Sequence, residues 1–86
     1  AYLGYLFHAS KKYDSALAYY TTIVNDGGAD TALLATTYNG MGACFNGLGI
    51  PDSSLNNYRR ALVLFEALGD TTKAIDVESN IAIVYK

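Results

Sequence analysis

The sequence of 86 residues lacks tryptophan and contains only one proline, one cysteine and one histidine. One cysteine cannot form an internal disulfide, which favours the cytoplasm and leaves the periplasm open. Zinc sites combine several cysteine and histidine ligands, and no acidic residue lies at ligand spacing from His8. We therefore expect neither a metal nor a cofactor.

Charge is also scarce and slightly acidic. Six Lys and Arg residues against eight Asp and Glu give a net charge of −2. Such a chain has no basic stripe for nucleic acid and no polybasic patch for a membrane surface. The basic pairs at 11–12 and 59–60 are interpreted as solvated rather than phosphate-binding. Apolar runs fall far short of the roughly 18 residues of a membrane span, so we expect no membrane insertion.

Apolar side chains, in contrast, are abundant. Hydrophobic residues make up 51% of the sequence, and eight residues are tyrosines. This composition excludes a disordered chain, and the length allows one domain at most, with a thin core. The sequence begins and ends within apolar patterns, so we expect a piece of a longer protein.

An internal repeat runs through the chain. Shifting the sequence against itself by 38 or by 40 positions brings residues of like size and polarity into register. The aligned positions are 14–17 with 52–55, Tyr20 with Tyr58, 30–31 with 70–71, and 41–42 with 81–82. Repeats of 20 to 50 residues are typical of solenoids, in which each unit buries its apolar face against a neighbour.

Within each unit the apolar residues recur at the three- and four-residue steps of a helix. Asp30 and Asp70 precede such segments and are predicted N-caps, while Pro51 suits the first turn of a helix. Glycines mark the predicted helix exits. The sequence therefore predicts an all-α fold with five helices, at 1–10, 13–26, 31–47, 51–68 and 71–86.

Two Asn-Gly pairs, at 39–40 and 46–47, favour a β-hairpin instead. Their flanks keep helical steps rather than alternating, so the helix remains the prediction. Each glycine costs helix stability by about 1 kcal/mol relative to alanine. Gly40, Ala43 and Gly47 indicate either a close approach of a ligand backbone or tight helix packing.

A family pattern emerges from these units. It is carried by Leu3, Gly4, Phe7, Ala16, Tyr20 and Ile23, by Met41, Gly42, Phe45, Gly49, Ser54, Tyr58 and Ala61, and by Ile81, Ala82 and Tyr85. The pattern resembles the tetratricopeptide repeat, with a longer period of 38 to 40 residues. The resemblance covers the whole chain and implies a right-handed superhelical solenoid of about two and a half units, at 1–28, 29–68 and 69–86.

The resemblance implies binding of a protein or peptide partner in a concave groove formed by the first helix of each unit. The implied groove residues are Tyr5, His8, Thr36, Asn39, Ala43, Asn46, Asp76, Ser79 and Ile83. Spacing supports part of this set, because Thr36, Asn39, Ala43 and Asn46 share one side of a helix. The alternative is that these positions form the solvated face of an amphipathic helix.

Catalysis is not expected. Cys44 and His8 could form a nucleophile and base only if the fold joined them, and Cys44 follows helical steps with Met41 and Leu48, which predicts a core thiol. Besides a binding scaffold, the sequence allows a sensory input domain of a bacterial signalling protein, whose kinase or DNA-binding output would lie outside this chain.

Solenoids usually carry three or more repeats with polar capping helices. Here apolar residues stand near both termini instead. They are Tyr2, Leu6, Ile75, Ile81 and Ile83. We therefore expect self-association through the ends of the repeat array.

Overall fold

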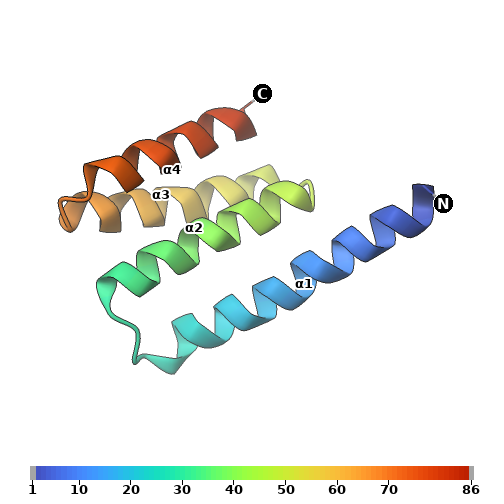
Figure 1. The fold of residues 1–86 in the computed structure, drawn as a ribbon, viewed down its shortest axis with the longest axis horizontal. Coiled ribbons are helices and arrows are strands. Elements are labelled where there is room, and N and C mark those ends of the chain that lie inside the picture. Colours follow the sequence, from blue (N-terminus) through green and yellow to red (C-terminus); the bar gives the residue numbers. More distant parts are fainter. Residues whose placement is uncertain (1, 86) are drawn as a thin grey trace.

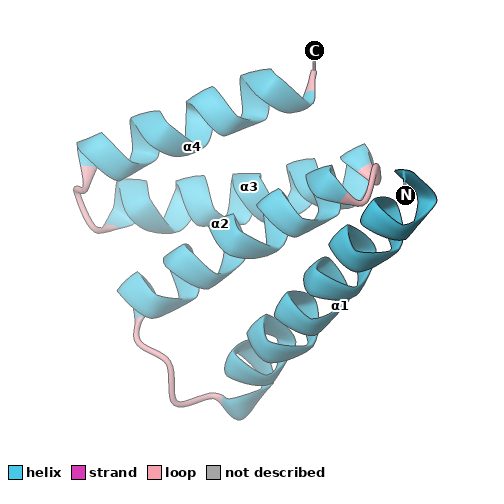
Figure 2. Ribbon diagram, turned by 45° about the vertical axis from the view of Figure 1, so that its right-hand side comes forward, coloured by secondary structure: helices cyan, strands magenta, loops and turns pink. Residues whose placement is uncertain are grey.

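A computed structural model describes the backbone of residues 2–85 and the side chains of residues 12–85. Four helices follow one another, with no strand among residues 2–85: α1 (Tyr2–Asp26), α2 (Thr31–Gly47), α3 (Pro51–Ala67) and α4 (Thr71–Val84) (Figure 1). Short loops join them (Figure 2). The predicted all-α fold is confirmed, and the Asn-Gly pairs of α2 lie in a helix.

The predicted count of five helices is wrong, because α1 is one helix from Tyr2 to Asp26 where two were expected. At the corresponding break between α2 and α3, Gly49 adopts a φ of +77° and Pro51 begins the next helix. The repeat alignment places Lys11 and Tyr13 at these two positions. Neither residue favours positive φ or lacks a backbone N–H, so nothing in the sequence stops the helix there.

Side-chain caps fix where two of the helices begin. The Asp30 carboxylate accepts a hydrogen bond from the backbone N–H of Leu33 at 2.8 Å. The Asp70 carboxylate accepts one from the backbone N–H of Lys73 at 3.2 Å. Both residues act as N-caps, as the sequence predicted, and they supply acceptors for amides that have no partner within the helix.

Helices α2 and α3 end in the same way. The backbone N–H of Ile50 donates to the carbonyl of Phe45, and that of Asp70 donates to the carbonyl of Phe65. Both hydrogen bonds require the chain to turn back at a glycine, Gly49 with φ +77° and Gly69 with φ +72°. Such caps stop a helix sharply, and they set the angle at which the next helix returns.

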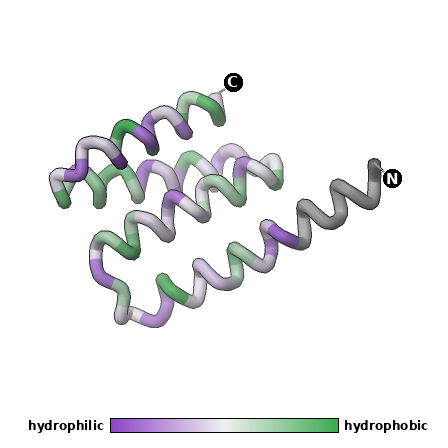
Figure 3. Tube along the Cα trace, in the orientation of Figure 1, coloured by the Kyte–Doolittle hydropathy of each residue, from purple (hydrophilic) through white to green (hydrophobic). Residues whose placement is uncertain are grey.

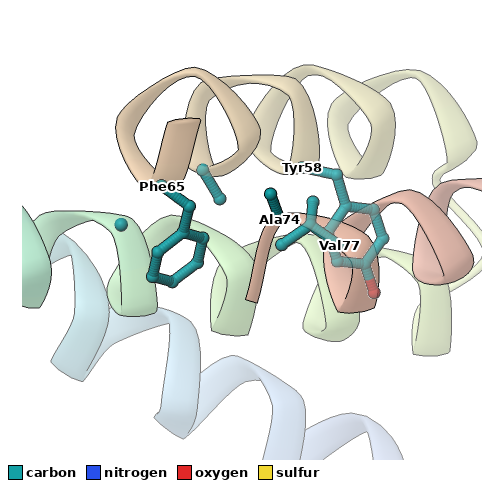
Figure 4. Packing of buried hydrophobic residues seen from close by; sticks show 6 residues of the cluster. Tyr58, Phe65, Ala74 and Val77 are labelled. Atoms are coloured by element: carbon teal, nitrogen blue, oxygen red, sulfur yellow. The ribbon is translucent and has the colours of Figure 1, made fainter. Parts of the chain in front are cut away.

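The core lies in one layer between α2, α3 and α4. Helix α3 packs against both of its neighbours, and α4 also reaches α2. The buried cluster consists of Ala35, Tyr58, Ala61, Phe65, Ala74 and Val77 (Figure 4). Helix α1 packs against α2, but none of its side chains at 12–26 is fully buried.

Three glycines of α2 receive tyrosine rings from the neighbouring helices. A methyl group at any of them would overlap a ring atom already in place. The pairs are Gly40 with Tyr20, Gly47 with Tyr13, and Gly42 with Tyr58. Gly40 and Gly47 therefore allow tight helix packing, which was one of the two interpretations of these glycines.

Polar and apolar residues are interspersed along each helix, as Figure 3 shows for the coloured part of the trace. Several large apolar side chains nevertheless face solvent, among them Tyr19 on α1 and Val63 on α3. Of the helices as far as they are described, none combines the length and the apolar character needed to cross a membrane.

Candidate functional site

A hollow of about 170 Å³ lies where α2, α3 and α4 meet. Thr36 and Asn39 line it from α2, Lys73 and Asp76 from α4, and Phe65 from α3. Three of the residues predicted to bind a partner, Thr36, Asn39 and Asp76, are therefore brought together. They come from two helices whose positions correspond in the repeat alignment.

An amide pair connects the two helices beside this hollow. The Nδ2 group of Asn80 donates a hydrogen bond to Oδ1 of Asn39 at 3.2 Å. The bond fixes which way the Asn39 amide points. Its own Nδ2 group has no hydrogen-bond partner among residues 12–85, so Asn39 keeps a donor for a ligand.

The hollow carries both signs of charge over an aromatic floor. The Lys73 ammonium lies 5.8 Å from the centroid of the Phe65 ring, a cation–π contact that holds the lysine across the hollow. Phe65 itself is only 3% exposed. With Asp76 as acceptor and Lys73 as donor, the hollow suits a ligand that presents hydrogen-bonding groups of both kinds.

The remaining predicted residues lie further along the same two helices. Ala43 and Asn46 on α2, and Ser79 and Ile83 on α4, are exposed and do not line the hollow. Steps of three and four residues place them on the side of each helix that carries Asn39 or Asp76. We call the whole set the α2–α4 face: Thr36, Asn39, Ala43, Asn46, Lys73, Asp76, Ser79, Asn80 and Ile83.

Two predicted residues, Tyr5 and His8, fall outside the side chains that the structure describes. Sequence reasoning also missed Lys73, Asn80 and Phe65. Lys73 precedes Asp76 by three residues, a spacing that could have placed it on the same face. Asn80 aligns with Gly40 in the repeat, and Phe65 lies on α3, between the two helices of the face. The repeat pattern therefore gave no signal for either residue.

Cys44 is a core thiol, as predicted. It is 6% exposed, and burial raises its pKa above the ordinary thiol value of 9.0. Burial also raises the pKa of Tyr58 above 10.0, and the nearby Cys44 adds to the effect. Both groups therefore favour their neutral, protonated forms, whereas a reactive cysteine requires the thiolate.

These two pKa values predict a loss of stability at high pH. Above pH 9 the unfolded chain releases protons that the folded chain still holds, so the free energy of unfolding falls as the pH rises. Below about pH 8 both groups are protonated in the folded and the unfolded chain, so they contribute no pH dependence there. We expect the melting temperature to fall more steeply between pH 9 and 11 for the wild type than for Cys44→Ala. Equal slopes for the two proteins would contradict this prediction.

Among the described residues, no group of three or more His, Cys, Asp or Glu side chains is placed to hold a metal ion. Comparison with known proteins gave no match, since no family model, curated protein or solved structure is significantly similar to this chain.

Proposed function

We propose that this chain is a tetratricopeptide-like segment whose α2–α4 face binds an extended peptide or protein partner, without catalysis. The repeat alignment makes α2 and α4 the first helices of successive units in a helical solenoid. The observation that carries the proposal is the hollow lined by Thr36, Asn39 and Asp76, residues that the resemblance to the tetratricopeptide repeat implies for partner binding.

The side chains around the hollow match the chemistry of an extended peptide. Its backbone offers N–H donors and C=O acceptors in alternation. Asn39 and Lys73 can donate to its carbonyls, Asp76 can accept from its N–H groups, and the Thr36 hydroxyl can do either. A partner bound here would lie across α2 and α4, over the aromatic floor that Phe65 provides.

The test is a peptide selected against the folded chain from a random display library, with its Kd measured by titration calorimetry. Asn39→Ala and Asp76→Ala should each weaken binding about tenfold, the effect of one lost hydrogen bond to a polar or charged group. Asn25→Ala removes an exposed asparagine at the end of α1 and should leave the Kd unchanged. Selected peptides that bind all three variants like the wild type would contradict the proposal.

We also propose that the chain self-associates through the exposed apolar residues of its last helix, α4, a surface that shares Ile83 with the α2–α4 face. Ile75 is 55% exposed and Ile83 58% exposed, and Tyr85 follows with 66%. Ile81, also expected at this surface, instead packs against the core. Tyr2 and Leu6 lie outside the described side chains.

Substitution of Ile75 and Ile83 by glutamate should abolish the association, because it places charge where apolar surface would be buried. Sedimentation equilibrium should show a mass that rises with concentration for the wild type and stays monomeric for the double variant. Glu78→Gln, an exposed polar change on the same helix, is the control. A wild type that remains monomeric at high concentration would refute self-association.

A further inference from the structure

A second and larger hollow, of about 450 Å³, lies along α3 and is bordered by Tyr38 of α2. We call it the arginine hollow. It is lined by Tyr38, Asn56, Arg59, Arg60, Val63 and Leu64. Its volume falls in the range of small-ligand sites, and it combines two cations with apolar and aromatic surface.

Two tyrosines, one on α2 and one just after α4, orient the two guanidinium groups. Cζ of Arg60 lies 5.6 Å from the centroid of the Tyr38 ring on α2. Nη2 of Arg59 donates a hydrogen bond to the hydroxyl of Tyr85, just beyond α4, at 2.9 Å. A cation–π contact and a single hydrogen bond orient an arginine without neutralising it.

These charges are not already paired within the described part of the chain. Among residues 12–85, neither Arg59 nor Arg60 forms an ion pair with a carboxylate. Each guanidinium carries five N–H donors in a planar fork, and the contact with Tyr85 uses only one of them. A protein of net charge −2 thus keeps two cations from consecutive residues, each oriented by a tyrosine and neither paired with a carboxylate, at one hollow.

Besides the arginines, Tyr38 and the polar Asn56, the hollow is lined by two apolar residues. Val63 is 64% exposed, and Leu64 beside it is half-buried against the core. An anion alone would leave this surface uncovered. A ligand that covers it must carry an apolar group next to its negative charge.

We propose that the arginine hollow binds an acidic peptide segment, in which a carboxylate side chain engages Arg59 and Arg60 and an apolar neighbour covers Val63. A planar carboxylate matches the guanidinium fork with two parallel hydrogen bonds. Phosphate sites commonly add free backbone N–H groups at a helix N-terminus, and the middle of α3 has none, since its amides bond within the helix. The geometry therefore favours a carboxylate over a phosphate.

This site is separate from the α2–α4 face. Tyr38 and Thr36 are two residues apart on α2, which places them on opposite sides of the helix. The arginine hollow therefore does not depend on the function proposed for the α2–α4 face, and a ligand could occupy each site at the same time.

The test uses the peptide acetyl-Phe-Glu-Leu-Glu-amide, titrated into the ¹⁵N-labelled chain and followed by amide chemical shifts. Saturable shifts should appear at Tyr38 and at residues 56–64. The matched acetyl-Phe-Gln-Leu-Gln-amide should bind about tenfold more weakly, because it lacks the charged acceptors. A third peptide with phosphotyrosine in place of the first glutamate distinguishes phosphate from carboxylate recognition.

The variant Arg59→Gln with Arg60→Gln should abolish these shifts while its spectrum stays that of a folded protein. Lys11→Gln with Lys12→Gln makes the same change in net charge and should bind like the wild type. Equal binding of the glutamate and glutamine peptides would overturn the proposal. Tighter binding of the phosphotyrosine peptide, or shifts confined to the α2–α4 face, would overturn it as well.

Discussion

Replacing Phe65 with alanine should lower the free energy of unfolding by about 3–5 kcal/mol, the usual cost of deleting a buried aromatic ring. Phe65 is 3% exposed and belongs to the cluster that joins α2, α3 and α4. A chain of this length is typically stable by about 4–13 kcal/mol, so the loss is a large share of the total. The melting temperature should fall by more than about 12 °C.

Phe65→Leu is the matched control. Leucine keeps most of the volume, so it should cost less than about 1.5 kcal/mol while it removes the aromatic surface beneath Lys73. Urea unfolding measures the free energy of unfolding of both variants. The loss common to both reports the missing aromatic ring, and the additional loss in Phe65→Ala reports the missing volume in the core. If Phe65→Ala proved as stable as Phe65→Leu, Phe65 would not be the centre of the core.

Replacing Gly42 with alanine should destabilise the fold although alanine is the better helix former. The new methyl carbon would lie 2.6 Å from Cδ1 and 2.9 Å from Cγ of Tyr58. Tyr58 is 3% exposed, so its ring cannot move aside, and Ser54 donates a 2.7 Å hydrogen bond to the Gly42 carbonyl that holds the helices together there. Overpacking of about 1–3 kcal/mol should exceed the roughly 1 kcal/mol gain in helix propensity.

Gly47→Ala makes the same change on the same helix with a different outcome. There the methyl group would meet only the far end of the Tyr13 ring, and Tyr13 is half-buried rather than fully buried, so the ring can move toward solvent. We expect a stability close to that of the wild type, because the gain in helix propensity offsets the displacement. Thermal unfolding that ranked Gly47→Ala below Gly42→Ala would contradict this view of the packing.

The starts of the helices were predictable wherever a residue at the boundary itself determines them. The expected starts at 31, 51 and 71 are those observed for α2, α3 and α4, because Asp30, Pro51 and Asp70 act within one helical turn. The break expected near residue 11 was wrong because it extended the repeat to a segment without the glycine and proline that end α2 and begin α3. Local residues prevailed there over the longer pattern.

Tertiary contacts were less accessible from the sequence. The family resemblance implied Thr36, Asn39 and Asp76 as groove residues, helical spacing supported the first two, and the structure brings all three to one hollow. The sequence gave no sign of the bond between Asn39 and Asn80, which joins residues 41 positions apart. That contact requires α2 and α4 to lie at the right distance from each other against α3. The distance is set by the packing of side chains such as Phe65, which the periodicity of the sequence does not predict.

The central claim is that a partner lies across the α2–α4 face, and site-directed photo-crosslinking tests it most directly. A photoreactive residue replaces Thr36 on α2 or Ser79 on α4, and a third protein carries it in place of Thr22 on α1; all three positions are exposed. A display-selected peptide should crosslink at positions 36 and 79 and not at 22. Crosslinking at 22 alone, or equally at all three positions, would contradict the claim.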